Sequence, residues 1–270
     1  MKKIVSLILI VITLASLLVS CGAKSYDDLM IVDLGFDKEY FGIAFRSGSD
    51  MTRKVEDITL QLINDGKLEE LSEKYEVGAV GKDEYTPKAE AYEGSGDWAY
   101  IQEKGKLVIG VTDYKPMDYI ENGEWLGFDA DYARAVCEIL GVEAEFKEID
   151  WDNKLLELES KKIDCIWNGL TITDDIEAVA DCTAPYMYNT QVAVVLKDNQ
   201  EKYKSISDLT GVSIAAEAGS AGAKVITENE SLKDGFKEVV AQTDALLEVL
   251  ASASEVAIVD LTLAKALIKN

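Results

Sequence analysis

Short apolar runs alternate with amphipathic helical stretches along most of this 270-residue chain. Strand-like runs cover residues 106–111, 143–149 and 163–167, and helical patterns cover residues 129–140 and 154–161. Strands that alternate with helices in this way are typical of α/β folds with largely parallel sheets. The sequence therefore predicts an α/β fold.

The same alternation returns towards both ends of the chain. Later strand-like runs cover residues 191–196, 212–216, 239–240 and 256–259, and a helix is expected at 261–268. Near the front, residues 29–33 and 41–45 have the pattern of strands, and two helices follow through Tyr75. Residues 76–97 show neither period, so we expect a linker there.

The charge balance limits the partners and the chemistry. The chain has 27 Lys and Arg against 50 Asp and Glu, a formal net charge of −23. It offers no basic stripe to a phosphate backbone, so we expect no nucleic-acid partner. It also has no histidine, which removes imidazole as a general base and as a metal ligand. From composition alone, either catalysis by a carboxylate, Cys, Lys or Tyr or no catalysis stays open.

Residues 1–20 resemble a secretory signal peptide. Two lysines precede an apolar run from Ile4 to Val19, which is short for a membrane span. The run ends in Leu18-Val-Ser-Cys-Gly22, which resembles the lipobox of bacterial lipoproteins. The resemblance implies export, lipidation of Cys21, and anchoring at the outer face of the cell membrane. A plain signal peptide with a chance cysteine is the alternative.

The remaining cysteines do not suggest a disulfide framework. They are Cys137, Cys165 and Cys182, an odd number. Cys137 lies in a helical pattern and Cys165 in a strand-like run. We expect buried, small apolar side chains rather than a bridge or a redox role.

From Trp98 onward, several motifs occur in a particular order. They are Leu107-Val-Ile-Gly-Val-Thr-Asp-Tyr-Lys-Pro-Met117, Gly127-Phe-Asp129, Asp164-Cys-Ile-Trp-Asn-Gly-Leu-Thr-Ile-Thr173, Pro185-Tyr186, Asp208-Leu-Thr-Gly211, Ala218-Gly-Ser-Ala-Gly222 and Val256-Ala-Ile-Val-Asp260. In order and spacing, the series resembles the extracellular solute-binding proteins of amino-acid ABC importers, family 3 type. The resemblance implies a periplasmic-binding-protein-like fold of type II, with a solute clasped between two α/β lobes.

The segment before residue 76 resembles the C-terminal segment of the same family. Members continue beyond the last of these motifs through a strand, a hinge segment and two helices, whereas this chain ends at Asn270. Because residues 28–75 resemble the missing piece, we expect a circular permutation in which residues 76–97 join the old termini. A tail fragment fused before a truncated copy is the alternative.

The permutation redistributes the lobes along the sequence. The resemblance then implies one lobe from residues 40–188, which includes the linker, and a second from residues 190–270 together with 26–36. We expect the chain to cross between them at residues 36–41 and 187–192.

The resemblance also assigns ligand-binding positions in the first lobe. Tyr114 matches the aromatic residue that covers the solute side chain, and Trp151 matches an apolar or aromatic wall position. Asn168, Gly169 and Thr171 match the strand-end segment whose backbone and hydroxyl bind the polar head of the solute.

Further positions belong to the second lobe. Glu217, Gly219, Ser220 and Ala221 match a loop at the start of a helix, where backbone N–H groups are free. Asp260 matches the carboxylate that pairs with the α-ammonium of an amino acid.

Ile176 departs from the family pattern, which places an arginine there to bind the α-carboxylate. Isoleucine cannot replace that cation. Three possibilities follow: the ligand lacks a carboxylate, another cation such as Lys115 or Arg46 substitutes, or binding has been lost. A small amine or quaternary ammonium compound fits a site that keeps carboxylates and aromatic rings.

Three classes of function remain. The resemblance favours a lipid-anchored, monomeric receptor that delivers an amino acid or a small polar amine to an ABC permease, without catalytic residue, cofactor or metal. A non-transport binding or sensor module, or a degenerate or engineered receptor, is the second class. An enzyme on the same scaffold, similar to the dehydratases of this fold, is the third.

Overall fold

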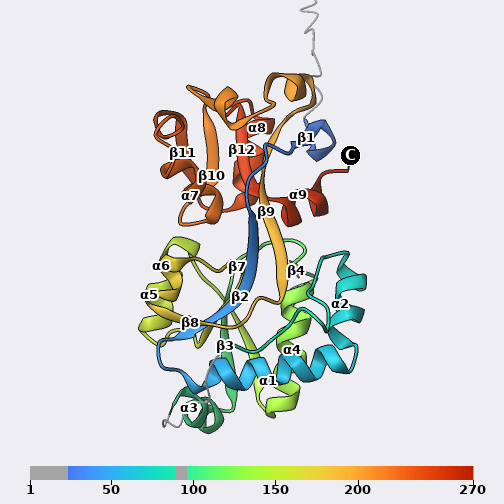
Figure 1. The fold of residues 1–270 in the computed structure, drawn as a ribbon, viewed down its shortest axis with the longest axis vertical. Coiled ribbons are helices and arrows are strands. Elements are labelled where there is room, and N and C mark those ends of the chain that lie inside the picture. The colour runs from blue at the N-terminus through green and yellow to red at the C-terminus, as the bar shows by residue number, and fades with distance from the viewer. Residues whose placement is uncertain (1–23, 89–95, 270) are drawn as a thin grey trace, which may run out of the picture.

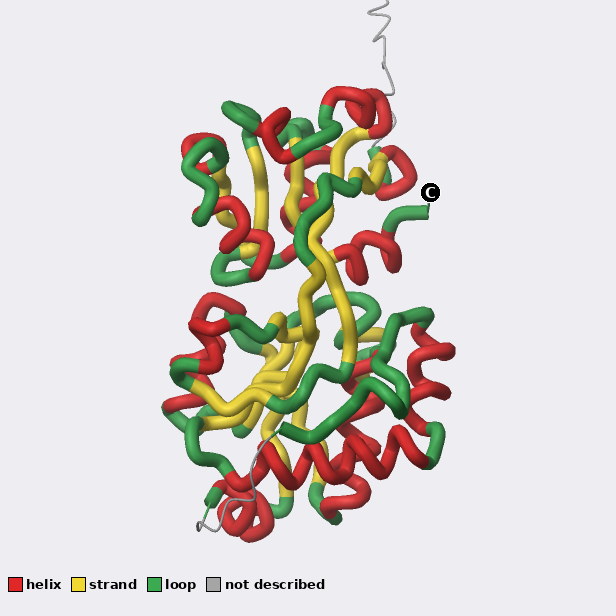
Figure 2. The backbone as a smooth tube through the Cα atoms, in the orientation of Figure 1, coloured by secondary structure: helices red, strands yellow, loops and turns green. Residues whose placement is uncertain are grey.

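The computed structural model describes residues 24–88 and 96–269. Figure 1 shows two groups of helices and strands, named here the large lobe (below) and the small lobe (above). Two long strands, β2 (Lys38–Arg46) and β9 (Met187–Leu196), run from one lobe into the other. They pair antiparallel from Lys38 with Thr190 to Phe41 with Met187, and Figure 2 shows them as the strands that span the waist.

One sheet continues through both lobes. Its other strands are β1 (Leu29–Val32), β3 (Lys106–Val111), β6 (Glu143–Glu148), β7 (Cys165–Thr171), β8 (Ala180–Cys182), β10 (Ile214–Glu217), β11 (Phe236–Val239) and β12 (Val256–Asp260). Strands β4 (Tyr119–Glu121) and β5 (Glu124–Leu126) form a separate two-stranded hairpin. The order is β11-β10-β12-β9-β2-β7-β3-β6, with β1 on β9 and β8 on β2. Strand β3 is parallel to β6 and β7, and β10 is parallel to β11 and β12.

Helices cover both faces of the sheet in each lobe. They are α1 (Asp50–Asn64), α2 (Lys67–Tyr75), α3 (Asp97–Lys104), α4 (Phe128–Leu140), α5 (Lys154–Glu159), α6 (Asp174–Glu177), α7 (Ala221–Thr227), α8 (Gln242–Leu250) and α9 (Leu261–Leu267). In the large lobe α1, α2 and α4 pack together on one face, and α5 covers the other. In the small lobe α8 and α9 lie opposite α7. The predicted α/β class is confirmed.

Strand β2 illustrates why both faces need cover. Phe41, Ile43 and Phe45 alternate along it and join the core beneath α1 and α4, whereas Ala44 faces the cluster around α5. Helix α1 starts where the Ser49 hydroxyl accepts a hydrogen bond from the backbone N–H of Met51 at 3.3 Å. The strand-to-helix turn therefore carries β2 directly under its own covering helix.

The described part of the expected linker, residues 76–88, forms no helix and none of the named strands. Its residues 76–88 pack against the large lobe: Val80 and Tyr85 are buried, and the Val80 N–H donates to the Tyr186 carbonyl at 2.9 Å. The segment lacks periodicity because isolated apolar side chains, rather than a helix or a strand, attach it. Residue 97, placed in the linker by sequence, instead begins α3.

Two further expectations concern the cysteines and the N-terminus. Cys137, Cys165 and Cys182 are buried and unbridged, as predicted. The predicted signal peptide at residues 1–20 and the lipidation site Cys21 lie outside the described residues. Across residues 24–88 and 96–269, no helix combines the length and the apolar character that crossing a membrane requires.

Candidate functional site

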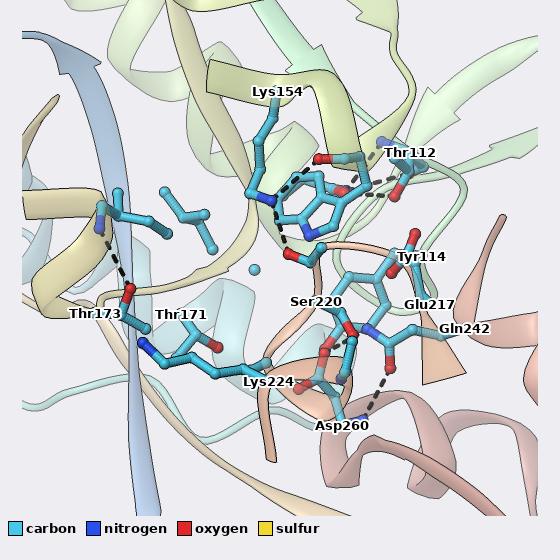
Figure 3. A pocket seen from close by; sticks show the side chains of 18 of the residues that line it. Thr112, Tyr114, Lys154, Thr171, Thr173, Glu217, Ser220, Lys224, Gln242 and Asp260 are labelled. Carbon is cyan, nitrogen blue, oxygen red and sulfur yellow. Dashed lines mark hydrogen bonds between the residues drawn. The ribbon is translucent and has the colours of Figure 1, made fainter. Parts of the chain in front are cut away.

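A cavity of about 310 Å³ lies between the two lobes, with walls from both (Figure 3). The large lobe supplies residues around the ends of β3 and β7 and from α5 and α6, and the small lobe supplies the ends of β10 and β12 with α7 and α8. The structure brings all the ligand-binding positions assigned by sequence to this one cavity: Tyr114, Trp151, Asn168, Gly169, Thr171, Ile176, Glu217, Gly219, Ser220, Ala221 and Asp260.

Asn168 and Gly169 form the wall at the end of β7. The Asn168 amide is fully used: its oxygen accepts from the N–H and hydroxyl of Thr112, and its NH₂ donates to the Thr112 carbonyl and to Asp118. Gly169 has φ +57°, and a Cβ atom there would lie 2.6 Å from the Tyr114 ring. A glycine is therefore required for Tyr114 to pack flat against this wall.

Two buried carboxyl groups support this wall from behind. Asp118 accepts from the Asn168 amide at 2.8 Å, and Asp129 accepts from the Gly169 N–H at 2.7 Å and from the Tyr186 hydroxyl at 2.8 Å. Burial raises the pKa of Asp129 to about 7, and burial followed by the Asp129 charge raises that of Asp118 well above its usual range. The pair therefore holds a proton near neutral pH.

Asp260, at the end of β12, is surrounded by amides. Its Oδ1 accepts from Asn189 at 2.5 Å and from Gln191 at 2.6 Å, and its Oδ2 accepts from Gln242 at 2.5 Å. The same Asn189 and Gln191 amides donate to Glu39 of β2, at 3.2 and 2.9 Å. Burial and then the Asp260 charge raise the pKa of Glu39 to about 7. Asp260 is thus tied to both crossing strands.

Glu217, at the end of β10, is buried, with 4% of its surface exposed. Within residues 24–88 and 96–269, no group forms a hydrogen bond or an ion pair with its carboxyl group. Burial first, and then the Asp260 charge, raise its pKa to about 8, while Lys154 acts in the opposite direction. The cavity therefore contains a buried acid that has no proton donor.

Two lysines that sequence reasoning missed line the cavity. Lys154 of α5 is 6% exposed, and its ammonium donates to the Gly219 carbonyl at 2.8 Å and the Trp151 carbonyl at 3.1 Å. Lys224 of α7 reaches across to Asp175 of α6 and forms an ion pair. The two cations proposed from sequence lie elsewhere: Lys115 stacks over Tyr119, and Arg46 pairs with Asp97.

Several of the remaining predicted residues already make contacts within the protein. The Lys154 ammonium lies 4.8 Å from the centre of the Trp151 ring, so one face of that ring is covered. Ile176 packs into the apolar cluster that contains Trp151. The Thr171 hydroxyl points to Glu39 at 3.4 Å, and the Ser220 hydroxyl caps α7. Gly219 has φ +67° and a Cβ there would meet Asp152 at 2.8 Å, so it permits close approach of the lobes.

Other lining residues were not assigned to the site from sequence. Thr112 and Thr173 lie within the quoted motifs, whereas Leu155, Asp175 and Gln242 lie outside them, and all five line the cavity beside Lys154 and Lys224. Lys154 and Leu155 begin an ordinary amphipathic helix, and Lys224 has the spacing of a surface residue on α7. Among the described residues there is no group of three or more Cys, Asp or Glu side chains arranged to hold a metal ion.

Comparison with known protein families gives a match over more than half of the chain. The family "Bacterial extracellular solute-binding proteins, family 3" matches residues 107–267. The chain belongs to this family. The predicted resemblance is thereby confirmed, and so is the periplasmic-binding-protein-like fold, since solved structures of such proteins match this one.

Individual relatives agree with the family. The L-cystine-binding protein TcyJ of Escherichia coli is 33% identical over 122 residues, which cover 44% of this chain and 46% of TcyJ. An arginine-bound mutant of ArgBP from T. maritima is 31% identical with a TM-score of 0.60, and the match covers 63% of this chain and 79% of that one. The ancestral amino-acid-binding protein AncCDT-1, a precursor of cyclohexadienyl dehydratase, is 31% identical, with a TM-score of 0.58 and coverage of 61% and 74%.

These relatives define what the chain is similar to. The chain spans about half the length of the curated relatives that it matches. The family and these relatives are substrate-binding proteins rather than enzymes, and the family is extracellular by its description.

Proposed function

We propose that this protein is the substrate-binding component of an ABC importer and that its solute is an amino acid or a related small polar amine. The observation that carries the proposal is the cavity, which gathers the family's ligand positions from both lobes. Its volume of about 310 Å³ suits a small solute. The binding residues that we propose are Tyr114, Trp151, Asn168, Gly169, Thr171, Ile176, Glu217, Gly219, Ser220 and Asp260.

We propose in addition that the protein is exported, acts as a monomer, and is anchored by a lipid on Cys21. The extracellular character of the family and the lipobox support this location. Substitution of Cys21 by Ser should leave export intact and release the protein from the membrane fraction, because a lipid is its proposed anchor. Retention of the variant in membranes after signal cleavage would contradict the anchoring.

We propose that the chain order is circularly permuted relative to the family. The support is topological: residues 26–75 contribute a strand, a crossing, a strand and two helices that complete both lobes, yet the family match begins at residue 107. The proposed lobes are residues 40–188, and residues 190–270 with 26–36. A variant with residues 96–269 first, a Gly/Ser linker, and then residues 24–88 should fold and bind as the parent does. Failure of that variant to fold cooperatively would contradict the permutation.

Calorimetric titration tests the binding function directly. The panel contains the standard amino acids, L-cystine, 1,4-diaminobutane and tetramethylammonium, each recovered afterwards and analysed for chemical change. We expect one class to bind and to be returned unchanged, and import of that solute to depend on the protein in cells. Chemical conversion of the bound solute, or binding of nothing in the panel, would contradict the proposed function.

A further inference from the structure

The carboxyl groups of the cavity are unequal in their hydrogen bonding. Asp260 accepts three amide N–H bonds of 2.5 to 2.6 Å through its two oxygens. Glu217 accepts none from any described residue, although it is 4% exposed and lines the same cavity. A buried acid without a donor is costly to keep, so the position calls for a partner that the described residues do not supply.

The surroundings of Glu217 are mostly acidic. The charged groups that act on it from neighbouring elements are Asp260 of β12, Asp244 of α8, Asp150 before α5, and Lys154 of α5. Lys154 is the one cation in this set, and its ammonium donates to the Gly219 and Trp151 carbonyls. The three carboxylates outweigh this one ammonium, so the net local charge attracts a further cation towards Glu217.

We propose that Glu217, rather than Asp260, is the group that pairs with the positive charge of the solute, a proposal that rests on the proposed function. The solute class is a small molecule with an ammonium or guanidinium group. Asp260 then acts as a positioning residue, because its amide partners tie it to Glu39 and Gln242. Figure 3 labels Glu217, Asp260 and Gln242 on the same wall of the cavity, the wall formed by the small lobe.

Protonation of Glu217 makes the affinity for a cation depend on pH. In the empty cavity Glu217 holds its proton up to pH values near its raised pKa of about 8. A cation that pairs with Glu217 requires the carboxylate, so binding below this pH releases a proton to solvent. Affinity for the cation should therefore rise with pH, by on the order of tenfold between pH 6.5 and 8.5.

Calorimetry with L-arginine and 1,4-diaminobutane, and with 1,4-butanediol as the uncharged probe, tests the assignment on two variants. Glu217→Gln should lower the affinity for the cationic probes by at least about tenfold, leave any binding of the diol little changed, and remove most of the proton release. Glu143→Gln is the control, because this exposed glutamate lies on β6 of the large lobe and is not among the residues that line the cavity. It should change affinity less than about twofold.

The outcomes separate the inference from the proposed function. Cation binding that survives Glu217→Gln with its pH dependence intact would overturn the inference and leave the function standing. The same holds if only neutral probes bind the unmodified protein. If Glu217→Gln fails to fold by circular dichroism, Glu217→Asp, which keeps the charge but shortens the reach, should weaken cationic probes selectively. Failure of all probes and all amino acids to bind would overturn both.

Discussion

At the scale of single residues, the cavity wall depends on the protonation of two buried carboxyl groups that lie behind it. Asp118 and Asp129 each have one carboxyl oxygen without a hydrogen-bond partner in the described part of the chain. Their other oxygens hold Asn168 and Gly169. Because two buried carboxylates repel each other, burial favours a state in which at least one of the two groups is protonated.

Replacement of Asp118 by Asn should therefore be tolerated, since the amide oxygen can still accept from Asn168 and the amide carries no charge. We expect the free energy of unfolding at pH 7 to change by less than about 1 kcal/mol, against a loss of about 1–3 kcal/mol for Asp118→Ala. Chemical denaturation of both variants measures the difference. A larger loss for Asp118→Asn than for Asp118→Ala would contradict a protonated Asp118–Asp129 pair at pH 7.

The same pair makes stability depend on pH in a definite direction. The pKa of Asp129 is raised to about 7, so above pH 4 the folded state binds more protons than the unfolded state. Its stabilising contribution is present at low pH and is lost as the pH rises through about 7. We expect the fall in unfolding free energy between pH 5 and 8 to be smaller in Asp118→Asn than in the parent, because the coupling is removed.

Ile176 places an apolar side chain at the cavity edge where the family resemblance implies an arginine. It packs in the apolar cluster with Trp151 and borders the cavity. Ile176→Arg should raise affinity for amino acids over the matching amines by roughly tenfold, because a guanidinium binds a carboxylate bidentately. Competition titrations with lysine and 1,5-diaminopentane measure this ratio. A ratio that stays unchanged in a folded variant would show that the carboxylate lies elsewhere.

At the scale of elements, two lysines join helices across the cavity. Lys224 of α7 pairs with Asp175 of α6, and Lys154 of α5 donates to the Gly219 carbonyl before α7. The first pair is largely exposed and the second contact is buried. We expect Lys154→Met to weaken ligand binding by about tenfold and Lys224→Met by only about two- to threefold.

Both lysines join the two lobes, so their loss should speed ligand dissociation and favour separation of the lobes. Stopped-flow dissociation rates and small-angle X-ray scattering test this ranking. Lys237→Met serves as the control, because Lys237 pairs with Glu248 inside the small lobe. It should change neither the rate nor the shape. A greater effect of Lys224→Met than of Lys154→Met would mean that surface charge, rather than the buried contact, holds the lobes together.

Elements with a clear period were predicted well from sequence. Strand β3 has the predicted bounds, and α4 and β12 differ from prediction by one residue. Helix α3 and helix α8 were missed, because short helices of mixed composition give a weak periodic signal. Among the site residues, the motif positions all line one cavity. Lys154 and Gln242 were missed because they contact residues outside their own local pattern, Gly219 and Asp260, which lie 65 and 18 positions further along the chain.

At the scale of the whole molecule, the segment around residues 89–95 connects two independently attached flanks. Before it, the Lys88 N–H donates to Glu56 at 3.2 Å, and after it the Trp98 N–H donates to Asp50 at 2.9 Å. A protease site inserted at residues 89–95 and cut should therefore leave the melting temperature within a few degrees of the uncut value. A cut between Asp37 and Lys38, where the chain crosses between lobes, should lower it clearly and abolish binding.

The pairing of β2 with β9 limits how the molecule can move. Hydrogen bonds between Lys38–Phe41 and Met187–Thr190 bind the two crossings into one ribbon, so the strands cannot slide past each other without breaking them. The two crossings must therefore bend together wherever they are paired. Glu39, Asn189 and Gln191 lie on that ribbon and contact Asp260 directly or through shared amides. Any change in its curvature therefore alters the field inside the cavity as well as its width.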